Sequence, residues 1–246
     1  MSVGFDHGGS FGGKEAAIVV LHGFTGSPAS FIPQVDALIA EGFRVEVPLL
    51  PGHGTTVEDL AETRFDHWWK EASSAIERVI AEGLPTFVMG LSMGGTLTLK
   101  AGVTFDELKG LIMINPAIEP PAASFFDLAR SLVEGGNKFL PAVGSDIKKE
   151  GISEPSYPET PIEAAISLFE SFDEIVEGLP SIKVPALLFN SVEDHVVPTS
   201  TSEFLVSKYG AKIERIWLKD SYHVATVDND SEFITQRSLE WIRASL

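Results

Sequence analysis

The sequence contains no cysteine among its 246 residues. Disulfide bonds, thiolate metal sites and a cysteine nucleophile are therefore excluded, and the chain needs no oxidising compartment to fold. Basic residues are also scarce, since 18 lysines and arginines face 35 aspartates and glutamates and give a net charge of −17. Such an acidic surface repels nucleic acids and anionic lipid headgroups and favours neutral or cationic small molecules. We therefore expect no nucleic-acid partner.

Long apolar runs are missing as well, because no stretch approaches the roughly 20 residues that span a bilayer, and we expect no stable membrane insertion. Residues 1–15 are glycine-rich and lack the basic and apolar regions of a signal peptide. We expect a loose lead-in there and a cytoplasmic protein. The composition, 44% hydrophobic and 22% charged, is typical of a folded globular protein, and the length suits one domain built on one sheet.

Short apolar runs alternate with helical patterns along most of the chain. Runs that are apolar on consecutive residues are typical of parallel strands buried on both faces. We predict strands at residues 16–21, 44–47, 86–89, 111–114, 186–189 and 212–218. Helical periodicity occurs at residues 31–39, 68–80 and 231–246. This alternation predicts a doubly wound α/β sheet.

The segment from residue 119 to residue 180 breaks this rhythm. It has no strand-like run, but it contains several prolines and helical fragments rich in phenylalanine. A helical interruption of about 60 residues is too long for a connector. We therefore predict a core of residues 1–118 and 181–246 with an insertion at 119–180, over the strand ends where such folds bind ligands. The alternative is a helical layer that only completes the core.

The sharpest motif surrounds Ser92. An apolar run ends in Gly90-Leu91-Ser92-Met93-Gly94, and a helical pattern follows at once. A serine on a sharp strand-to-helix turn has a strained backbone, and glycines two residues to either side avoid collisions. The turn lifts the hydroxyl above the sheet edge, and the helix N-terminus points its dipole at a developing anion. The pattern predicts a nucleophile; an ordinary serine in a glycine-rich turn is the alternative.

A serine nucleophile needs a base that takes its proton and a carboxylate that holds the base. With a serine on this kind of turn, the acid and then the base follow it in the chain. Only His195 and His223 come after Ser92. We predict His223 as the base, because it lies between the last strand and the final helix, whereas His195 directly follows an acid in an extended turn.

Three acids compete for the role of the carboxylate. Asp194 comes at the carboxyl end of a predicted strand, whereas Glu193 is one residue off and faces the other way. Asp228 follows His223 and breaks the chain order. We predict Asp194 as the acid, with Asp228 as a local helper or helix cap.

A tetrahedral intermediate needs two N–H donors aimed at its oxygen. One is the backbone N–H of Met93, the residue after the nucleophile. The other is expected from the loop after the first long strand, where Phe24 follows Gly23 in a sharp turn. We expect the imidazole of His22 to hold this loop by hydrogen bonds rather than to act as a second base, and we interpret the Pro-Gly-His-Gly segment around His53 as a rigid turn.

At this point the sequence resembles the α/β-hydrolase superfamily, and within it the monoacylglycerol lipase and carboxylesterase branch of bacilli. The motifs that carry the resemblance extend over nearly the whole chain and are Leu21-His-Gly-Phe-Thr-Gly26, Pro51-Gly-His-Gly-Thr55, Gly90-Leu-Ser-Met-Gly-Gly-Thr-Leu-Thr-Leu99, Glu193-Asp-His-Val-Val-Pro198 and Ser221-Tyr-His-Val-Ala-Thr226. The resemblance implies an α/β-hydrolase fold with a mostly parallel sheet, flanking helices and a helical cap at 119–180. It also implies a Ser92, Asp194 and His223 triad with the Phe24 and Met93 N–H groups as oxyanion hole.

The expected reaction is hydrolysis of a neutral carboxylic ester through an acyl-enzyme, without a metal or an organic cofactor. We expect monoacylglycerols and short- to medium-chain esters as substrates, with Phe125, Phe126 and Phe139 of the insertion in contact with them. A thioesterase or a carbon–carbon bond hydrolase on the same triad, or a small-molecule binder without turnover, remain alternatives. The oligomeric state stays open. Dehalogenases and epoxide hydrolases are disfavoured, because they need a carboxylate where Ser92 stands.

Overall fold

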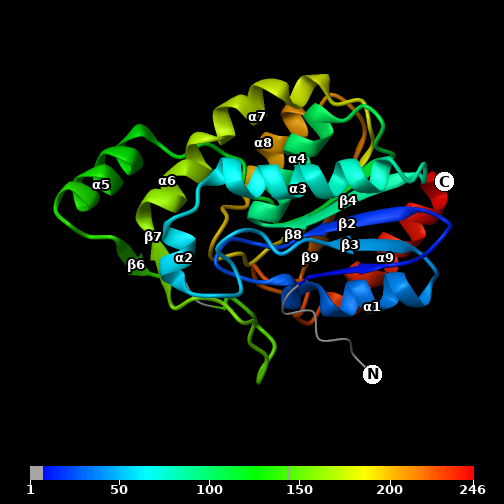
Figure 1. Cartoon of the computed structure of the whole chain (residues 1–246), viewed down its shortest axis with the longest axis horizontal. Coiled ribbons are helices and arrows are strands. Elements are labelled where there is room, and N and C mark those ends of the chain that lie inside the picture. Colours follow the sequence, from blue (N-terminus) through cyan, green and yellow to red (C-terminus); the bar gives the residue numbers. More distant parts are fainter. Residues whose placement is uncertain (1–7, 143–144) are drawn as a thin grey trace.

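The computed structural model describes residues 8–142 and 145–246. At its centre is a seven-stranded sheet with the order β1-β3-β2-β4-β5-β8-β9 (Figure 1). The strands are β1 (Gly9–Phe11), β2 (Ala17–Leu21), β3 (Arg44–Val47), β4 (Thr86–Leu91), β5 (Gly110–Ile114), β8 (Ala186–Ser191) and β9 (Ile213–Leu218). Neighbouring strands are parallel except β1, which runs antiparallel to β3. The predicted α/β fold class with a mostly parallel sheet is confirmed.

All six predicted strands are present, but one edge strand was missed. Gly9–Phe11 pairs with the free edge of β3, with Gly9 opposite Val47 and Phe11 opposite Val45. The prediction of a loose lead-in was therefore wrong for these three residues, while residues 1–7 lie outside the described part of the chain. A three-residue strand that includes glycine has no readable alternation, and its pairing is decided by the exposed edge of β3.

Helices cover both faces of the sheet. They are α1 (Ile32–Ala40), α2 (Val57–Ala61), α3 (Phe65–Ile80), α4 (Met93–Thr104), α5 (Ala123–Glu134), α6 (Ile162–Glu170), α7 (Phe172–Gly178), α8 (Ser200–Lys208) and α9 (Ser231–Ser245), with short 3₁₀ helices at Pro28–Phe31 and Leu179–Ser181. In Figure 1, α3, α4, α7 and α8 lie above the sheet and α1 and α9 below it. Successive residues of β2 divide between the two layers, since Val19 belongs to the core cluster with α3 and α4, and Ile18 to the cluster with α1 and α9.

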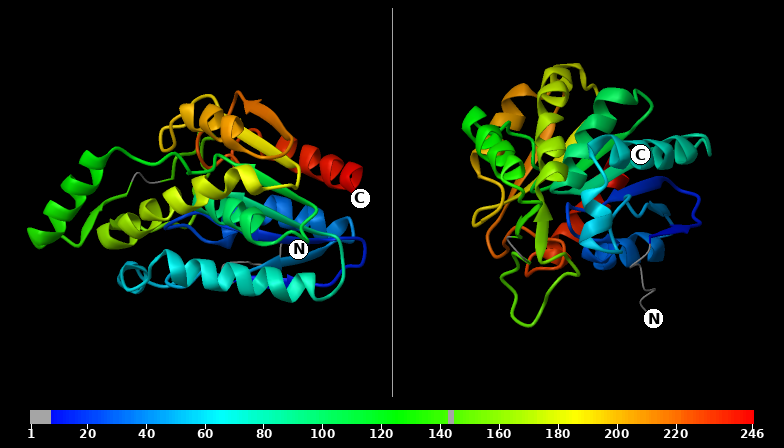
Figure 2. Two further views of the ribbon diagram at one scale, coloured as in Figure 1. Left: turned by 90° about the horizontal axis from the view of Figure 1, so that it is seen from above. Right: turned by 60° about the vertical axis from the view of Figure 1, so that its left-hand side comes forward.

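The insertion contains a feature that the sequence did not reveal. We expected no strand between residues 119 and 180, yet β6 (Phe139–Pro141) and β7 (Glu159–Pro161) form a two-stranded antiparallel sheet. This expectation was wrong because each strand has only three residues and is held by a partner distant in the chain rather than by a local pattern. Seen from above, α5 extends away from the central sheet (Figure 2, left).

The end of the insertion packs differently from its start. Helix α7 contacts α4 of the core, and its Phe172 and Ile175 belong to the same buried cluster as Leu97 of α4. Helix α5, in contrast, has Ala129 as its one buried residue. The boundaries at 119 and 180 remain a prediction. At its C-terminal end the insertion is packed into the core through α7.

Candidate active site

Ser92 occupies the turn between β4 and α4 with φ 54° and ψ −118°. This is a left-handed backbone conformation that costs a serine on the order of 1–3 kcal/mol and persists only where the surroundings enforce it. Two backbone hydrogen bonds do so: the Ser92 N–H donates to the carbonyl of Ile114 at 3.0 Å, and the Ala117 N–H donates to the carbonyl of Ser92 at 3.3 Å. The turn therefore has the strain that the sequence motif predicts.

The glycines around Ser92 are required by backbone approaches on both sides of the turn. A Cβ atom on Gly90 would lie 2.1 Å from the carbonyl oxygen of Gly94, and one on Gly94 would lie 1.9 Å from the carbonyl oxygen of Leu21. Both clashing atoms are backbone oxygens, which cannot move aside as the end of a flexible side chain could. The two glycines thus allow α4 to begin directly against β2 and β4.

His223 and Asp194 lie on different loops and meet through their side chains. The Nδ1 of His223 donates to Oδ2 of Asp194 over 2.8 Å, and the two side chains are only 8% and 3% exposed. The other oxygen of Asp194 accepts the N–H groups of Val196 and Val197, each at 2.8 Å. Because every one of these contacts fixes the carboxylate, the imidazole is held by Nδ1 and its Nε2 is the nitrogen left to accept a proton.

Asn115 joins the loops that carry these residues. Its side-chain N–H donates to the carbonyl of His223 at 2.8 Å, and its oxygen accepts the Ser191 N–H at 2.7 Å at the end of β8. Ile114, the residue before it, accepts the Ser92 N–H. The end of β5 thus connects the serine turn, the histidine loop and the strand leading to Asp194. We did not single out Asn115, although a polar residue directly after a fully apolar strand was a usable signal.

The competing residues have other contacts. His195 is 55% exposed and donates from Nδ1 to Asp146 at 2.8 Å. Glu193 reaches Lys148 at 3.5 Å on the surface. Neither contact involves Ser92.

Asp228 is buried and saturated by backbone donors. Its two carboxylate oxygens accept the N–H groups of Lys148, Lys149, Tyr222 and Asn229 at 2.7–2.8 Å. The residue therefore fixes the histidine loop to the insertion, and it has no hydrogen bond to the imidazole of His223 among the described contacts.

The loop after β2 lies against the serine turn. A Cβ atom on Gly23 would be 3.5 Å from Cβ of Ser92, so Phe24 follows at the point where this loop faces the nucleophile. Met93 is the first residue of α4. Thr25 has φ 62° and is held in this conformation by the Tyr157 N–H, which donates to its carbonyl at 3.1 Å. Met93 is thus adjacent to Ser92 and Phe24 follows the glycine that approaches it, and the oxyanion hole formed by their N–H groups stays a prediction.

Two buried histidines stand behind this loop. His22 donates from Nδ1 to the carbonyl of Gly23 at 3.0 Å and accepts the Leu50 N–H on Nε2 at 3.2 Å. Its ring centre lies 4.8 Å from that of His53. Burial lowers the pKa of His22 to about 4, and burial together with the charge of His22 lowers the pKa of His53 to about 3. Both rings are therefore neutral at neutral pH and hold the loop by hydrogen bonds and packing, as expected for His22.

Glu154 is a further titratable group near His223 that sequence reasoning missed. Burial raises the pKa of its carboxyl to about 7, while the charge of His223 acts to lower it. Its Oε2 lies 3.4 Å from the position of a Cβ atom on Gly26, in the loop that follows β2. No pattern marks Glu154 in the sequence, because it lies in an irregular stretch of the insertion.

A mainly apolar cavity of about 280 Å³ opens where the start of the insertion meets α6, α7 and the loop of Asp194. Its lining includes Ala117, whose N–H donates to Ser92, and Val197, whose N–H donates to Asp194. Phe169 and Phe172 close the side formed by α6 and α7. The cavity can take an apolar chain.

The three phenylalanines predicted to contact substrate lie farther out. Phe125, which is 37% exposed, stacks on Phe126 with ring centres 5.6 Å apart and on Phe169 at 4.9 Å. Phe139 lies partly buried on β6. Phe125 thus reaches the apolar cavity through Phe169, and a direct role of the three residues stays a prediction.

Residues 8–142 and 145–246 contain no helix with the length and apolarity needed to cross a bilayer. The same residues contain no group of three or more histidine, aspartate or glutamate side chains arranged to hold a metal ion.

The family model described as "Alpha/beta hydrolase family" matches residues 18–236. Among curated proteins, a thermostable monoacylglycerol lipase of a Bacillus species is 36% identical over 91% of this chain and 89% of its own length, and a carboxylesterase of Bacillus subtilis is 25% identical over 95% and 94%. A solved structure from work on the metagenome-derived lipolytic enzymes LipS and LipT superposes with a TM-score of 0.92 at 36% identity, covering 99% of this chain and 100% of that one. A monoacylglycerol lipase of Paleococcus ferrophilus, at 19% identity and a TM-score of 0.79 over 98% and 99%, shares the fold.

Proposed function

Because the chain belongs to the alpha/beta hydrolase family, in agreement with the predicted resemblance to bacterial monoacylglycerol lipases and carboxylesterases, we propose that it cleaves carboxylic esters with a Ser92–His223–Asp194 triad. The observation that carries the proposal is the buried 2.8 Å hydrogen bond between His223 and Asp194, on loops that Asn115 joins to the end of β5, where Ile114 accepts the N–H of the strained Ser92. A fixed imidazole with a free Nε2 is the base that a serine hydroxyl needs.

In the proposed reaction, Nε2 of His223 takes the proton of Ser92 as its oxygen attacks the ester carbonyl. Asp194 stabilises the imidazolium that forms, and the Phe24 and Met93 N–H groups stabilise the oxyanion. His223 then gives its proton to the leaving alcohol. Water, activated by the same imidazole, releases the acid from the acyl-enzyme and restores Ser92.

We propose monoacylglycerols and short- to medium-chain esters as the substrates. The names of the two Bacillus relatives support this class. The apolar cavity lined by Ala117, Phe169 and Val197 is of a size for one acyl chain rather than three. The net charge of −17 favours neutral esters over polyanionic acyl-CoA thioesters and gives no reason for a nucleic-acid partner. The cytoplasmic location stays a prediction.

The test is a kcat/KM series over monoacylglycerols, triacylglycerols, acyl-CoA thioesters and p-nitrophenyl esters of graded length. We expect monoacylglycerols and p-nitrophenyl esters of roughly four to twelve carbons to be cleaved best, since each buried methylene adds about 0.8 kcal/mol of binding. A preference for acyl-CoA over every oxygen ester would make the protein a thioesterase. A lack of turnover on all of them, with tight ligand binding, would make it a binding protein.

A further inference from the structure

A short part of the insertion touches both loops that carry the proposed acid and base. This bridging segment, residues 145–149, lies next to the loop after β8, which holds Asp194, and the loop after β9, which holds His223. The backbone pairing of β8 and β9 ends at Ser191 and Leu218. Beyond that point the two loops need other contacts to stay in register with each other.

Asp146 supplies contacts to both loops from one carboxylate. Its Oδ2 accepts the His223 N–H at 3.0 Å and the His195 N–H at 3.3 Å, while its Oδ1 accepts Nδ1 of His195 at 2.8 Å. Its own carbonyl accepts the Val224 N–H at 3.0 Å. The side chain is only 11% exposed. One largely buried carboxylate therefore holds the backbone of the proposed base and the residue next to Asp194.

The rest of the bridging segment strengthens the same connection. The Lys148 and Lys149 N–H groups donate to Asp228, which also accepts the N–H of Tyr222 beside His223. The ammonium of Lys148 lies 3.5 Å from Glu193 and 3.3 Å from Asp220, one acid on each loop. Asp146 is thus one member of a network of hydrogen bonds and ion pairs that connects the same two loops to the bridging segment.

We infer that Asp146 is a positioning residue for ester hydrolysis: it keeps the loops of Asp194 and His223 at the separation at which their side chains bond. The inference rests on the proposed triad. It follows from the geometry, because a carboxylate that accepts from the His223 backbone and from both N–H groups of His195 fixes the two loops relative to each other. Misplacing a catalytic group by about 1 Å costs on the order of 100-fold in rate.

His195 is the titratable group that faces Asp146 in this network. The hydrogen bond that the imidazole of His195 donates to Asp146 raises the pKa of His195, and the carboxylates of Asp194 and Glu193 act in the same direction. The ring of His195 also packs edge-on against Tyr222, with centres 4.5 Å apart. His195, first considered as a base, therefore forms part of the link between the loops.

The experiment compares Asp146→Ala and Asp146→Asn with the parent enzyme on p-nitrophenyl butyrate, together with the rate at which a serine-directed phosphonate labels Ser92. For Asp146→Ala we expect kcat and the labelling rate to fall by about 10- to 100-fold with KM within about twofold, as for a misplaced catalytic group. Asp146→Asn keeps one acceptor oxygen and is expected to recover part of the rate. A role confined to stability would lower the melting temperature and leave kcat of the folded protein unchanged.

Asp106→Ala is the matched control, because this exposed acid pairs with Lys183 at 3.3 Å and belongs to neither loop. Its kcat should equal that of the parent. His195→Ala removes one partner of Asp146 but leaves the bond to the His223 backbone, and it should cost less than Asp146→Ala.

Three results would overturn the inference: an unchanged kcat in folded Asp146→Ala, an equal loss in Asp106→Ala, or a change in KM alone. If Asp146→Ala does not fold, the nearly isosteric Asp146→Asn decides by the same measurements. Failure of the proposed function looks different, because the parent enzyme itself would then show neither turnover nor labelling of Ser92.

Discussion

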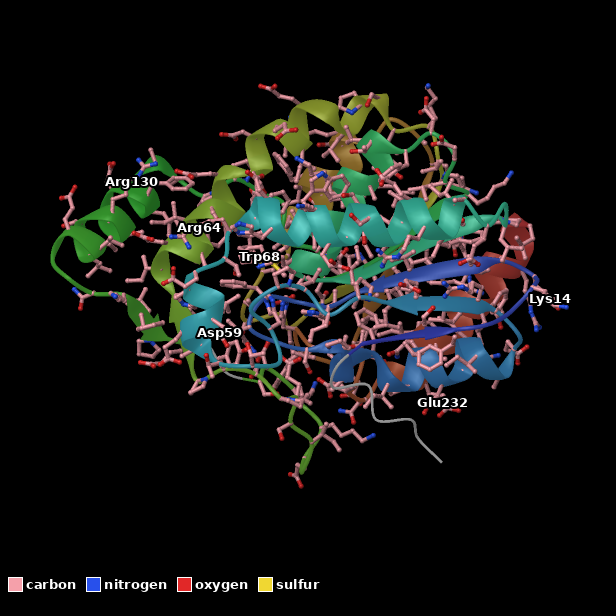
Figure 3. The ribbon with its side chains drawn as sticks, in the orientation of Figure 1. Lys14, Asp59, Arg64, Trp68, Arg130 and Glu232 are labelled. Atoms are coloured by element: carbon pink, nitrogen blue, oxygen red, sulfur yellow. The ribbon has the colours of Figure 1, made fainter. Side chains whose placement is uncertain are left out.

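The serine turn and the insertion at residues 119–180 are built in opposite ways. Around Ser92 the close contacts are between backbone atoms, and a single added Cβ on Gly94 would lie 1.9 Å from a carbonyl oxygen. In the insertion, α5 meets α6 through an exposed ion pair between Arg130 (Figure 3) and Glu170 at 2.8 Å and through the contact of Phe125 with Phe169, and Leu128 is 63% exposed. Such pairs contribute little, about 0–1 kcal/mol. The serine turn is thus fixed by backbone contacts in the core, whereas α5 of the insertion is held mainly by exposed side chains.

Arg64 gives a second example of how the insertion is held. Arg64 (Figure 3) forms an ion pair between partly exposed side chains with Glu163 of α6, and α6 also buries Ala164 and Leu168 in the core cluster that contains Phe65 of α3. Trp68 on α3, in contrast, is fully buried and packs against Phe24 with ring centres 5.3 Å apart. Substitutions at the serine turn should therefore change kcat, whereas substitutions in the insertion should change the preference among ester substrates.

The largest expected effect is at the nucleophile. Ser92→Ala should reduce kcat by on the order of 10⁶ while the protein folds normally, because alanine removes the attacking oxygen and little else. Kinetics on p-nitrophenyl butyrate, far-UV circular dichroism and mass spectrometry after phosphonate treatment measure this. Activity in the variant, or phosphonate on another serine, would refute the assignment.

Substitutions of the two candidate acids should affect different properties, with Asp194→Asn lowering mainly the activity and Asp228→Asn mainly the stability. Asp194→Asn should reduce kcat by about 10⁴, because an amide no longer stabilises the protonated imidazole. Asp228→Asn should leave kcat within about tenfold but lower the free energy of unfolding by about 3 kcal/mol, since an amide nitrogen cannot accept the N–H groups that one carboxylate oxygen now accepts. Steady-state kinetics and urea unfolding of both variants test the contrast, and the reverse ranking of kcat would exchange the two roles.

The buried histidines should make the protein sensitive to acid. The folded-state pKa values of His22 and His53, about 4 and 3, lie below the 6.5 of an exposed histidine. The unfolded chain thus binds more protons between pH 6.5 and about 4, so stability falls as the pH falls through this window, by on the order of 3 kcal/mol for His22 alone.

His53→Phe removes one of these groups and should flatten the decline of the melting temperature below pH 6.5. His195→Gln is the control, because His195 contributes to stability with the opposite pH dependence. Its raised pKa gives a stabilisation that is present at low pH and is lost as the pH rises through that pKa. An equally steep acid decline in His53→Phe would contradict the role of the buried pair.

The smallest expected effects concern the insertion. Phe169→Ala should raise KM for esters of eight to twelve carbons by about five- to tenfold more than for acetates, because Phe169 lines the apolar cavity. Phe125→Ala removes only the exposed outer ring and should shift the chain-length profile by less than about threefold. Equal profiles for Phe169→Ala and the parent would mean that the acyl chain lies elsewhere, whereas a larger effect at Phe125 would favour the outer phenylalanines predicted from the sequence.

Much of the candidate site was predictable because its residues obey local rules. The glycines around Ser92 have to accompany a strained turn, and Asp194 follows a buried strand at its carboxyl end. Strands β4 and β8 each extend two residues beyond the predicted 86–89 and 186–189, since the apolar pattern stops before the hydrogen-bonded ladder does. The ends of elements were therefore less predictable than their existence.

The sequence by itself determined the alternation of strands and helices along the chain, the strained serine turn and the candidate acid and base. These depend on the burial of neighbouring residues and on steric limits within a few peptide units, which a chain carries in its own pattern. Only the tertiary structure decided that β1 pairs at the edge, that β6 meets β7, and that Asn115 and Asp146 connect the loops. Each of these contacts joins segments far apart in the chain, so its energy depends on a partner that no local pattern specifies.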